Sequence, residues 1–355
     1  MIILGIETSC DETGVAIIET NSSKKKINLL SNKLASSLLI HSKTGGIIPE
    51  IAAREQVKYI IPVLESALKE AGFFNFQSST FNSIDAIAVT VGPGLVGSLL
   101  VGVETARTLS YLWKKPIIPV NHLIGHIYAN FVGEISNFKF QISNSQLPKF
   151  PAIALVVSGG HTDLVLLKDH NKLKWLGGTR DDAAGEAFDK IGRLLNLPYP
   201  GGPSIEKEAL NGNPKKFIFP KPMIGSGDFD FSFSGLKAAV FREVQVMKQS
   251  NNEAIADICA SVQESIIDVL VKKTTNAARK YEVKSILLGG GVASNSKLRE
   301  RFQSLIVNGK SSIKLFVPTK SLCTDNAAMI ASAAFYNYNE IPWQKVTANP
   351  ELYFY

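Results

Sequence analysis

The chain repeats one pattern of hydrophobic and polar positions in its two halves. Residues 2–19, "IILGIETSCDETGVAIIE", and residues 151–167, "PAIALVVSGGHTDLVLL", each read as an apolar run, a small polar turn and a second apolar run. Such patterns predict β-hairpins. Their tips are rich in serine, threonine and glycine, so backbone N–H groups there can approach a phosphate closely. An ordinary β-turn would explain either tip alone, but the repetition favours a shared function.

A longer pattern follows each hairpin and is also repeated. Residues 84–126 read as a strand, a glycine turn, a helix and a strand that leads into His122 and His126. Residues 283–331 follow the same order, with Asp325 at the place where the histidine pair stands in the first half. Apolar spacing of three and four residues predicts the helices, and β-branched runs predict the strands. This alternation indicates an α/β fold, and the duplication predicts two similar lobes around a cleft.

The pattern also suggests where the lobes begin and end. The first lobe is expected over residues 1–135, joined by a C-terminal helix over about 326–355, and the polar stretch 136–150 is expected to connect the lobes. The second lobe is expected over residues 151–325. Amphipathic runs broken by proline and glycine predict a mainly helical insertion within it, over about 180–280.

Composition narrows the class of protein. Of the 355 residues, 45% are hydrophobic and 19% charged, as in ordinary globular enzymes, and no apolar run is long enough to span a membrane. The start of the chain lacks a basic, cleavable leader pattern, and three widely spaced cysteines suggest neither a disulfide framework nor a zinc–cysteine site. We therefore expect a cytoplasmic protein. Its net charge of +7 suits a polyanionic partner such as nucleic acid, although no long basic block stands out.

A glycine motif at residues 92–97, "GPGLVG", satisfies the dinucleotide-binding pattern G-x-G-x-x-G. That pattern also needs an acidic residue at the end of the next strand, to bind the ribose hydroxyl. Here the next strand, "PIIPV", ends in Asn121 and His122. A tight turn between strand and helix explains the glycines without a dinucleotide.

His122 and His126 lie four residues apart, so on a helix they share one face and can hold one metal ion. Zinc proteases of the H-E-x-x-H type place a glutamate directly after the first histidine as the general base, and Leu123 stands there instead. The sequence therefore disfavours peptide hydrolysis by that route. A lone histidine pair is also more often structural than metal-binding.

Asp325 strengthens the metal interpretation. In a duplicated fold, its place faces that of His122 across the cleft, and two imidazoles with one carboxylate leave coordination positions open, as a catalytic metal requires. The alternative is that Asp325 caps the helix predicted for "NAAMIASAAF". A third glycine turn, "LGGGVASN" at residues 288–295, has bare backbone that fits a flat ring or ribose, with Asn295 to read polar edges; a plain turn fits it equally.

Ordered motifs over nearly the whole chain resemble one family, the bacterial branch of the tRNA N6-adenosine threonylcarbamoyltransferases, formerly named O-sialoglycoprotein endopeptidases. The resemblance implies the fold shared by actin, Hsp70 chaperones and sugar kinases, which agrees with the repeat described above. The motifs that carry it are "ETSCDETGVAI", "GGIIPEIAAREQ", "VTVGPGLVGSLLVG", "NHLIGHI", "LVVSGGHTDL", "DDAAGEAFDKIGRLL", "YPGGP", "FSFSGLK", "GGGVASNSKLR" and "TDNAAMIA".

The resemblance also implies a reaction. The threonylcarbamoyl group of threonylcarbamoyl-adenylate passes to N6 of adenosine 37, in tRNAs that read codons beginning with A, and AMP leaves. The donor is already activated, so catalysis works mainly through positioning. A base must take a proton from N6, and Asp11 and Glu12 at the first hairpin tip are candidates. A structural role in the turn explains these two residues equally well.

The family's binding residues carry over to matching positions. His122, His126 and Asp325 would bind one divalent metal ion, Fe²⁺ in the first place and Zn²⁺ as the alternative. Glu206 stands where bacterial members often carry aspartate, so its longer side chain would keep the carboxylate but move it. The residues that would bind the adenylate are Val157, Ser158, Gly159, Gly160, His161, Asp189, Gly202, Glu206 and Asn295.

The expected partners are tRNA, a smaller paralogous protein of the same actin-like fold and a P-loop ATPase of the same pathway, with no membrane. The amphipathic segment 103–112 is a candidate interface, although it also suits core packing. Two alternative functions remain open at this point: a metal-dependent endopeptidase, and a non-catalytic nucleotide-binding scaffold of the same fold. An open metal site disfavours the scaffold.

Overall fold

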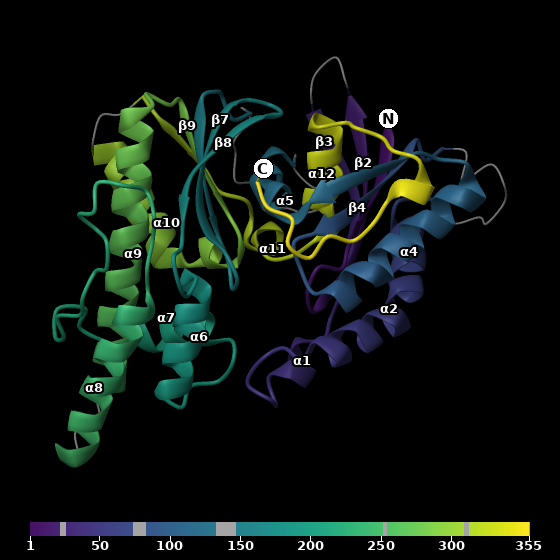
Figure 1. Cartoon of the computed structure of the whole chain (residues 1–355). Coiled ribbons are helices and arrows are strands. Elements are labelled where there is room, and N and C mark those ends of the chain that lie inside the picture. The colour runs from purple at the N-terminus through teal and green to yellow at the C-terminus, as the bar shows by residue number, and fades with distance from the viewer. Residues whose placement is uncertain (22–25, 74–82, 133–146, 251–253, 309–311, 355) are drawn as a thin grey trace. The chain divides into compact units, whose positions relative to one another are not determined.

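The computed structural model describes all of residues 1–355 except 22–25, 74–82, 133–146, 251–253, 309–311 and 355 (Figure 1). The chain divides into two compact units, Met1–Leu147 with Pro318–Tyr355, and Pro148–Val317. The C-terminal segment thus joins the first unit from Pro318, earlier than the expected residue 326. Most of the expected connection, 136–150, lies outside the described residues.

The first unit is built on a five-stranded sheet in the order β3-β2-β1-β4-β5. β2 is antiparallel to both β1 and β3, whereas β4 is parallel to β1 and β5. The strands are β1 (Ile2–Glu7), β2 (Glu12–Asn21), β3 (Lys26–Ser36), β4 (Ala86–Gly92) and β5 (Ile117–Asn121). The helical elements are α1 (Leu38–His41), α2 (Pro49–Glu70), α4 (Val96–Trp113), α5 (His122–Tyr128), η1 (Ala129–Phe131), α11 (Lys320–Cys323), α12 (Ala327–Tyr336) and η3 (Trp343–Lys345).

Side chains of β1 alternate between two packed faces, as the period of two in a strand requires. Leu4 and Ile6 belong to a buried cluster with residues of α2 and α4. Gly5 faces α12 instead, where a β-carbon would lie 2.5 Å from the carbonyl oxygen of Ala327. The absence of a side chain at Gly5 therefore lets the alanine-rich helix α12 pack directly on the sheet, on the face opposite α2 and α4.

The second unit repeats this topology. Its sheet has the order β10-β9-β6-β7-β8, with β7 antiparallel to β6 and β8, and β9 parallel to β6 and β10. The strands are β6 (Ala152–Val157), β7 (Thr162–Asp169), β8 (Lys172–Gly178), β9 (Ser285–Gly289) and β10 (Lys314–Phe316). The helical elements are α6 (Ala184–Leu194), α7 (Gly201–Ala209), α8 (Ser234–Ser250), α9 (Ile255–Lys280), η2 (Gly291–Ser294) and α10 (Ser296–Asn308).

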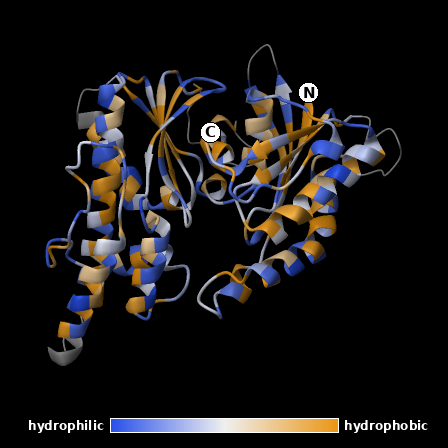
Figure 2. Cartoon of the chain, in the orientation of Figure 1, coloured by the Kyte–Doolittle hydropathy of each residue, from blue (hydrophilic) through white to orange (hydrophobic). Residues whose placement is uncertain are grey.

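Corresponding strands in the two sheets have the same neighbours and directions, so the duplicated α/β fold expected from the sequence is confirmed. Figure 2 shows that the inner strands of both sheets are predominantly hydrophobic, whereas the long helices α2 and α9 carry hydrophobic and hydrophilic positions in turn. The expected insertion at 180–280 contains α6, α7, α8 and α9. Within the described part of the chain, no helix is both long and apolar enough to cross a membrane.

Candidate functional site

The histidine pair lies on α5, which begins directly where β5 ends. Asn121 caps the helix, because its side-chain oxygen accepts hydrogen bonds from the backbone N–H groups of Leu123 (2.8 Å) and Ile124 (3.3 Å). With α5 fixed at its first turn, His122 and His126 lie one turn apart, with ring centroids 4.6 Å from each other. Both side chains are buried.

Asp325 lies between α11 and α12. The sequence offered it as a possible cap of the following helix, but Asn326 has that role, since its side chain accepts a hydrogen bond from the backbone N–H of Met329 (3.1 Å). α12 also packs closely on α5: a β-carbon at Gly125 would lie 2.7 Å from the Ile330 side chain. The Asp325 carboxylate is thereby brought to the histidines.

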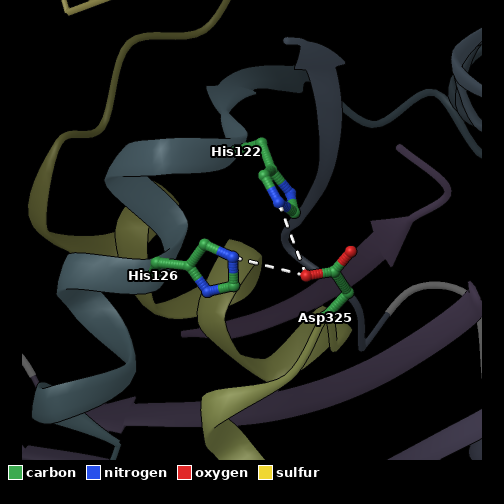
Figure 3. A group of neighbouring side chains, drawn as sticks. All are labelled: His122, His126 and Asp325. Carbon is green, nitrogen blue, oxygen red and sulfur yellow. Dashed lines mark ion pairs between the residues drawn. The ribbon is translucent and has the colours of Figure 1, made fainter. Parts of the chain in front are cut away.

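The three side chains converge on one point (Figure 3). The Asp325 Oδ1 atom lies 3.5 Å from His122 Nε2 and 3.3 Å from His126 Nε2. One ligand atom from each residue lies within 4.8 Å of the others. Two imidazoles and one carboxylate at this spacing could hold one shared cation.

The origin of Asp325 differs from the expectation based on internal symmetry. Internal symmetry predicts the carboxylate in the second lobe, facing the histidines of the first. The chain instead leaves the second unit at Val317, just after the short strand β10, and α11 and α12 belong to the first unit. Asp325 therefore lies in the same unit as His122 and His126, because α12 is needed to cover the open face of the first sheet.

The nitrogens of His126 are better suited to bind a metal ion than to form hydrogen bonds with their neighbours. Both ring nitrogens of His126 are buried, and neither has a hydrogen-bond partner among the described residues. Burial lowers the pKa of His126, which favours the neutral imidazole that metals bind. Although Asp325 lies 3.3 Å from His126 Nε2, the pair lacks hydrogen-bond geometry. A buried imidazole whose nitrogens form no hydrogen bond lowers the stability of the protein unless a ligand, such as a metal ion, binds to it.

His122 has a different environment, which sequence reasoning missed. Its Nδ1 lies 3.1 Å from the carboxylate of Glu7, at the end of β1, and 3.1 Å from the hydroxyl of Ser9. Burial opposes a charge on this ring, but the carboxylates of Glu7 and Asp325 raise the pKa of His122 to about 9. The available signal was a carboxylate at the end of a buried strand, directly before the first hairpin tip.

The first hairpin tip is tied down by its neighbours. Ser37 donates to the backbone oxygen of Asp11 (2.8 Å), and Gln56 donates to that of Glu12 (2.9 Å). Burial, followed by the charge of Asp325, raises the pKa of Asp11. Burial, followed by the charge of Asp11, raises the pKa of Glu12 to about 8. The Glu12 Oε1 atom accepts from Ser36 (2.8 Å), while its buried Oε2 has no hydrogen-bond partner among the described residues.

The second hairpin tip is more open. Val157 ends β6, and the turn closes through a hydrogen bond from Ser158 N–H to the His161 carbonyl oxygen (2.8 Å). The Ser158 hydroxyl accepts from the backbone N–H of His161 (3.2 Å). Gly159 and Gly160 are exposed, and a β-carbon on either would meet no atom of the described residues within 4 Å. Bare backbone at this tip is therefore accessible to a ligand.

The other residues expected at the adenylate hold helix ends in the second unit. Asp189 accepts from the backbone N–H of Gly201 (2.7 Å) at the start of α7, the helix that also carries Gly202, and burial raises the Asp189 pKa. Glu206 accepts from the N–H of Ser296 (2.8 Å), and Asn295 accepts from that of Leu298 (3.0 Å), both at the start of α10. These three side chains thus accept hydrogen bonds from the protein backbone. A contact with a ligand would be made in addition to these hydrogen bonds.

Comparison with known proteins agrees with this arrangement of elements. The sequence model of the family described as tRNA N6-adenosine threonylcarbamoyltransferase (TsaD) matches residues 28–332. The enzyme of that name from Moorella thermoacetica is 48% identical over 337 residues, which cover 95% of this chain and 92% of the relative. The enzyme of that name from Staphylococcus haemolyticus is 44% identical over 351 residues, 99% of this chain and 95% of the relative.

Solved structures support the fold alone. HypF from T. kodakarensis superposes with a TM-score of 0.59 at 13% identity, covering 95% of this chain and 47% of HypF. Component A of the Acidaminococcus fermentans (R)-2-hydroxyglutaryl-CoA dehydratase gives a TM-score of 0.52 at 13% identity, covering 95% and 98%. The family match and the full-length relatives, in contrast, identify the family and not only the fold. The chain belongs to the tRNA N6-adenosine threonylcarbamoyltransferase family.

Proposed function

We propose that this chain transfers the threonylcarbamoyl group of threonylcarbamoyl-adenylate to N6 of adenosine 37, in tRNAs that read codons beginning with A, with release of AMP. Family membership establishes the coarser activity, threonylcarbamoyl transfer to an adenosine N6 with tRNA as substrate. The observation that supports chemistry rather than a scaffold role is the convergence of His122, His126 and Asp325 within 4.8 Å. The net charge of +7 suits a tRNA substrate. An enzyme that acts on tRNA would be located in the cytoplasm.

His122, His126 and Asp325 are proposed to hold one divalent metal ion. Two imidazoles with one carboxylate and open positions are typical of Fe²⁺, with Zn²⁺ as the alternative. The ring nitrogens of the buried His126, which lack hydrogen-bond partners in the part of the chain that the structure describes, support this assignment. When bound, the ion supplies a Lewis acid for the carbonyl group of the donor or a binding point for its threonine part.

Val157, Ser158, Gly159, Gly160 and His161 are proposed to bind the AMP part of the donor. The open space over Gly159 and Gly160 supports this role, because backbone N–H groups can stabilise the phosphate as AMP leaves. Asp189, Gly202, Glu206 and Asn295 are proposed to border the adenylate while they hold α7 and α10. The helix ends that these residues hold would then be part of the binding site.

Gly160→Ala is expected to weaken donor binding without affecting folding. A β-carbon at this position meets no atom within 4 Å in the described part of the chain, so the thermal midpoint should stay within about 2 °C of that of the parent protein. It would occupy space that the phosphate needs, so KM for threonylcarbamoyl-adenylate should rise roughly tenfold. Steady-state kinetics and thermal melts measure the two effects. Gly225→Ala, which also meets no atom within 4 Å, is the matched control and should change neither quantity.

Glu12 is proposed to take the proton from N6, with Asp11 as the alternative base. A general base must be deprotonated, so kcat/KM should rise with pH through the pKa of Glu12, which burial raises to about 8. Glu12→Gln should lower kcat by roughly 10²-fold and abolish this rise. Pre-formed tRNA complexes assayed from pH 6 to 9.5 give the profile. A rise that persists in Glu12→Gln and disappears in Asp11→Asn would assign the base to Asp11.

The proposed partners are a smaller paralogue of the same fold and a P-loop ATPase. The segment 103–112 of α4 has two faces: Val103, Ala106 and Leu109 are buried in the core, while Tyr111 is 54% and Leu112 62% exposed. The exposed face supports an interface with the paralogue, and the buried face accounts for the core role that the same segment suggested. Apolar side chains that form a contiguous exposed patch are typical of interaction surfaces, whereas single exposed ones are not.

One reconstitution tests the proposed function. Purified protein, loaded with Fe²⁺ and combined with its partners, is incubated with threonylcarbamoyl-adenylate and unmodified tRNA. Mass spectrometry of the digested tRNA should detect threonylcarbamoyladenosine, and AMP should form in equal amount. Absence of both products would contradict the proposal. Metal-dependent cleavage of a protein substrate that is lost in His122→Ala would favour the endopeptidase, although Leu123 replaces the base that such enzymes use.

A further inference from the structure

Glu7 is a fully buried carboxylate at the end of β1. Its Oε1 atom accepts a hydrogen bond from the backbone N–H of Ser9 (2.6 Å). Its Oε2 atom accepts from the Thr90 hydroxyl on β4 (2.5 Å) and lies 3.1 Å from His122 Nδ1. Strand β4, the hairpin tip and α5 therefore all fix this one carboxylate.

The contact between Glu7 and His122 determines which nitrogen of the ring faces the metal ligands. A carboxylate beside Nδ1 holds a proton on that nitrogen, so the neutral ring that a metal binds offers its lone pair at Nε2. Nε2 is the atom that lies 3.5 Å from the Asp325 carboxylate. The Ser9 hydroxyl also lies 3.1 Å from Nδ1, on the same side as Glu7. The ring is thus oriented with its binding nitrogen toward His126 and Asp325.

The charges around Glu7 also support a cation on the Nε2 side of His122. A buried carboxylate costs several kcal/mol unless it is paired. Among the described residues, Glu7 forms an ion pair with His122 and with no lysine or arginine. Its counter-charge therefore has to lie on the His122 side. A cation bound at Nε2 of the same ring would supply it through the imidazole.

We propose that Glu7 is a positioning residue for the cation site, which orients His122 and adds negative charge behind it. This inference rests on the proposed metal centre and adds to it a residue that is not itself a ligand. Outer carboxylates that hold metal-binding histidines typically contribute 10- to 100-fold to metal affinity. Glu7 does not contact the cation directly, so its removal should weaken binding without removing the three ligands.

The test is a titration of the full-length, metal-free protein with Co²⁺, followed by the visible absorption of the bound ion and by competition with a chelator. The parent protein should bind one equivalent. Glu7→Ala should bind Co²⁺ roughly 10- to 100-fold more weakly and with a shifted spectrum. Glu7→Gln has nearly the same shape, but its amide keeps only one of the two carboxylate oxygens that face Ser9 and His122, so its affinity for Co²⁺ should also fall about tenfold.

Thr90→Val is the matched control. It removes the other side-chain hydrogen bond to Glu7 Oε2 and leaves the carboxylate in place, so the Co²⁺ spectrum should be unchanged and the affinity should stay within about threefold. If Glu7→Ala fails to fold, Glu7→Gln carries the test. A parent protein that binds no Co²⁺ would overturn the metal centre and this role with it. Parent-like affinity and spectrum in both Glu7 variants would overturn the positioning role alone.

Discussion

Replacement of Asp325 by alanine is expected to abolish stable cation binding and to reduce tRNA modification by roughly 10³-fold or more. The carboxylate is the one anionic member of the proposed ligand group, and its Oδ1 atom lies within 3.5 Å of both Nε2 atoms. Its loss leaves two imidazoles without an anionic ligand, and such a pair holds a divalent ion weakly. Polarisation of the donor carbonyl is worth several kcal/mol of transition-state stabilisation, which sets the size of the effect on rate.

Two measurements distinguish this loss from a loss of fold. Metal content after dialysis should fall from one equivalent to a small fraction of it, while the thermal midpoint of the metal-free protein should change little, because Asn326 and not Asp325 caps α12. Asp169→Ala, an exposed position at the end of β7, is the control and should retain metal and activity. Full activity in Asp325→Ala would favour the scaffold interpretation and refute the proposed chemistry.

Gly290→Ala is expected to destabilise the protein by about 3 kcal/mol or to prevent folding of the second unit. Gly290 follows β9 with a φ of +92°, a conformation that residues with a β-carbon rarely adopt and that costs about 1–3 kcal/mol. A β-carbon there would also overlap with the backbone carbonyl oxygen of Val157, on the neighbouring strand β6. The backbone cannot move aside as a flexible side chain can. The free-energy costs of the strained φ and of the steric overlap therefore add.

The neighbouring glycine provides the control. A β-carbon at Gly291 meets no atom within 4 Å, so Gly291→Ala should change the free energy of unfolding by less than about 0.5 kcal/mol. Denaturant titrations followed by circular dichroism measure both variants. Gly290 lies directly beside Val157, the last residue before the second hairpin tip. Gly290→Ala should therefore also lose donor binding. Equal stability of the two variants would contradict the strain argument.

Much of the fold was predictable because hydrophobic periodicity reports directly on which face of an element is buried. The repeated hairpins and the strand–helix–strand runs that follow correspond to two sheets with the same strand order. The family could also be inferred, since ordered glycine and histidine motifs persist over the whole chain. The boundary at Pro318 was not predictable, because it depends on which sheet face needed α12 as a cover, and this is a property of packing rather than of local pattern.

The candidate site was predictable in part. Four-residue spacing identified His122 and His126 as neighbours, but symmetry placed Asp325 in the wrong unit, because corresponding places in a repeat need not belong to corresponding units. Glu7 was missed because one carboxylate in a strand has no spacing signature. The hydrogen bonds that Asp189 and Glu206 accept from backbone N–H groups at the starts of α7 and α10 also became visible only in three dimensions, since their partners are distant in the sequence.

The shared origin of the three proposed ligands has a consequence for how the enzyme matures. A polypeptide in which Leu147 is joined by a short artificial linker to Pro318 would still contain every ligand atom, together with Glu7. Binding of the proposed divalent ion would thereby be independent of occupancy by the activated donor. Cells starved of threonylcarbamoyl-adenylate would accumulate protein that is already metallated and ready to work once the donor returns.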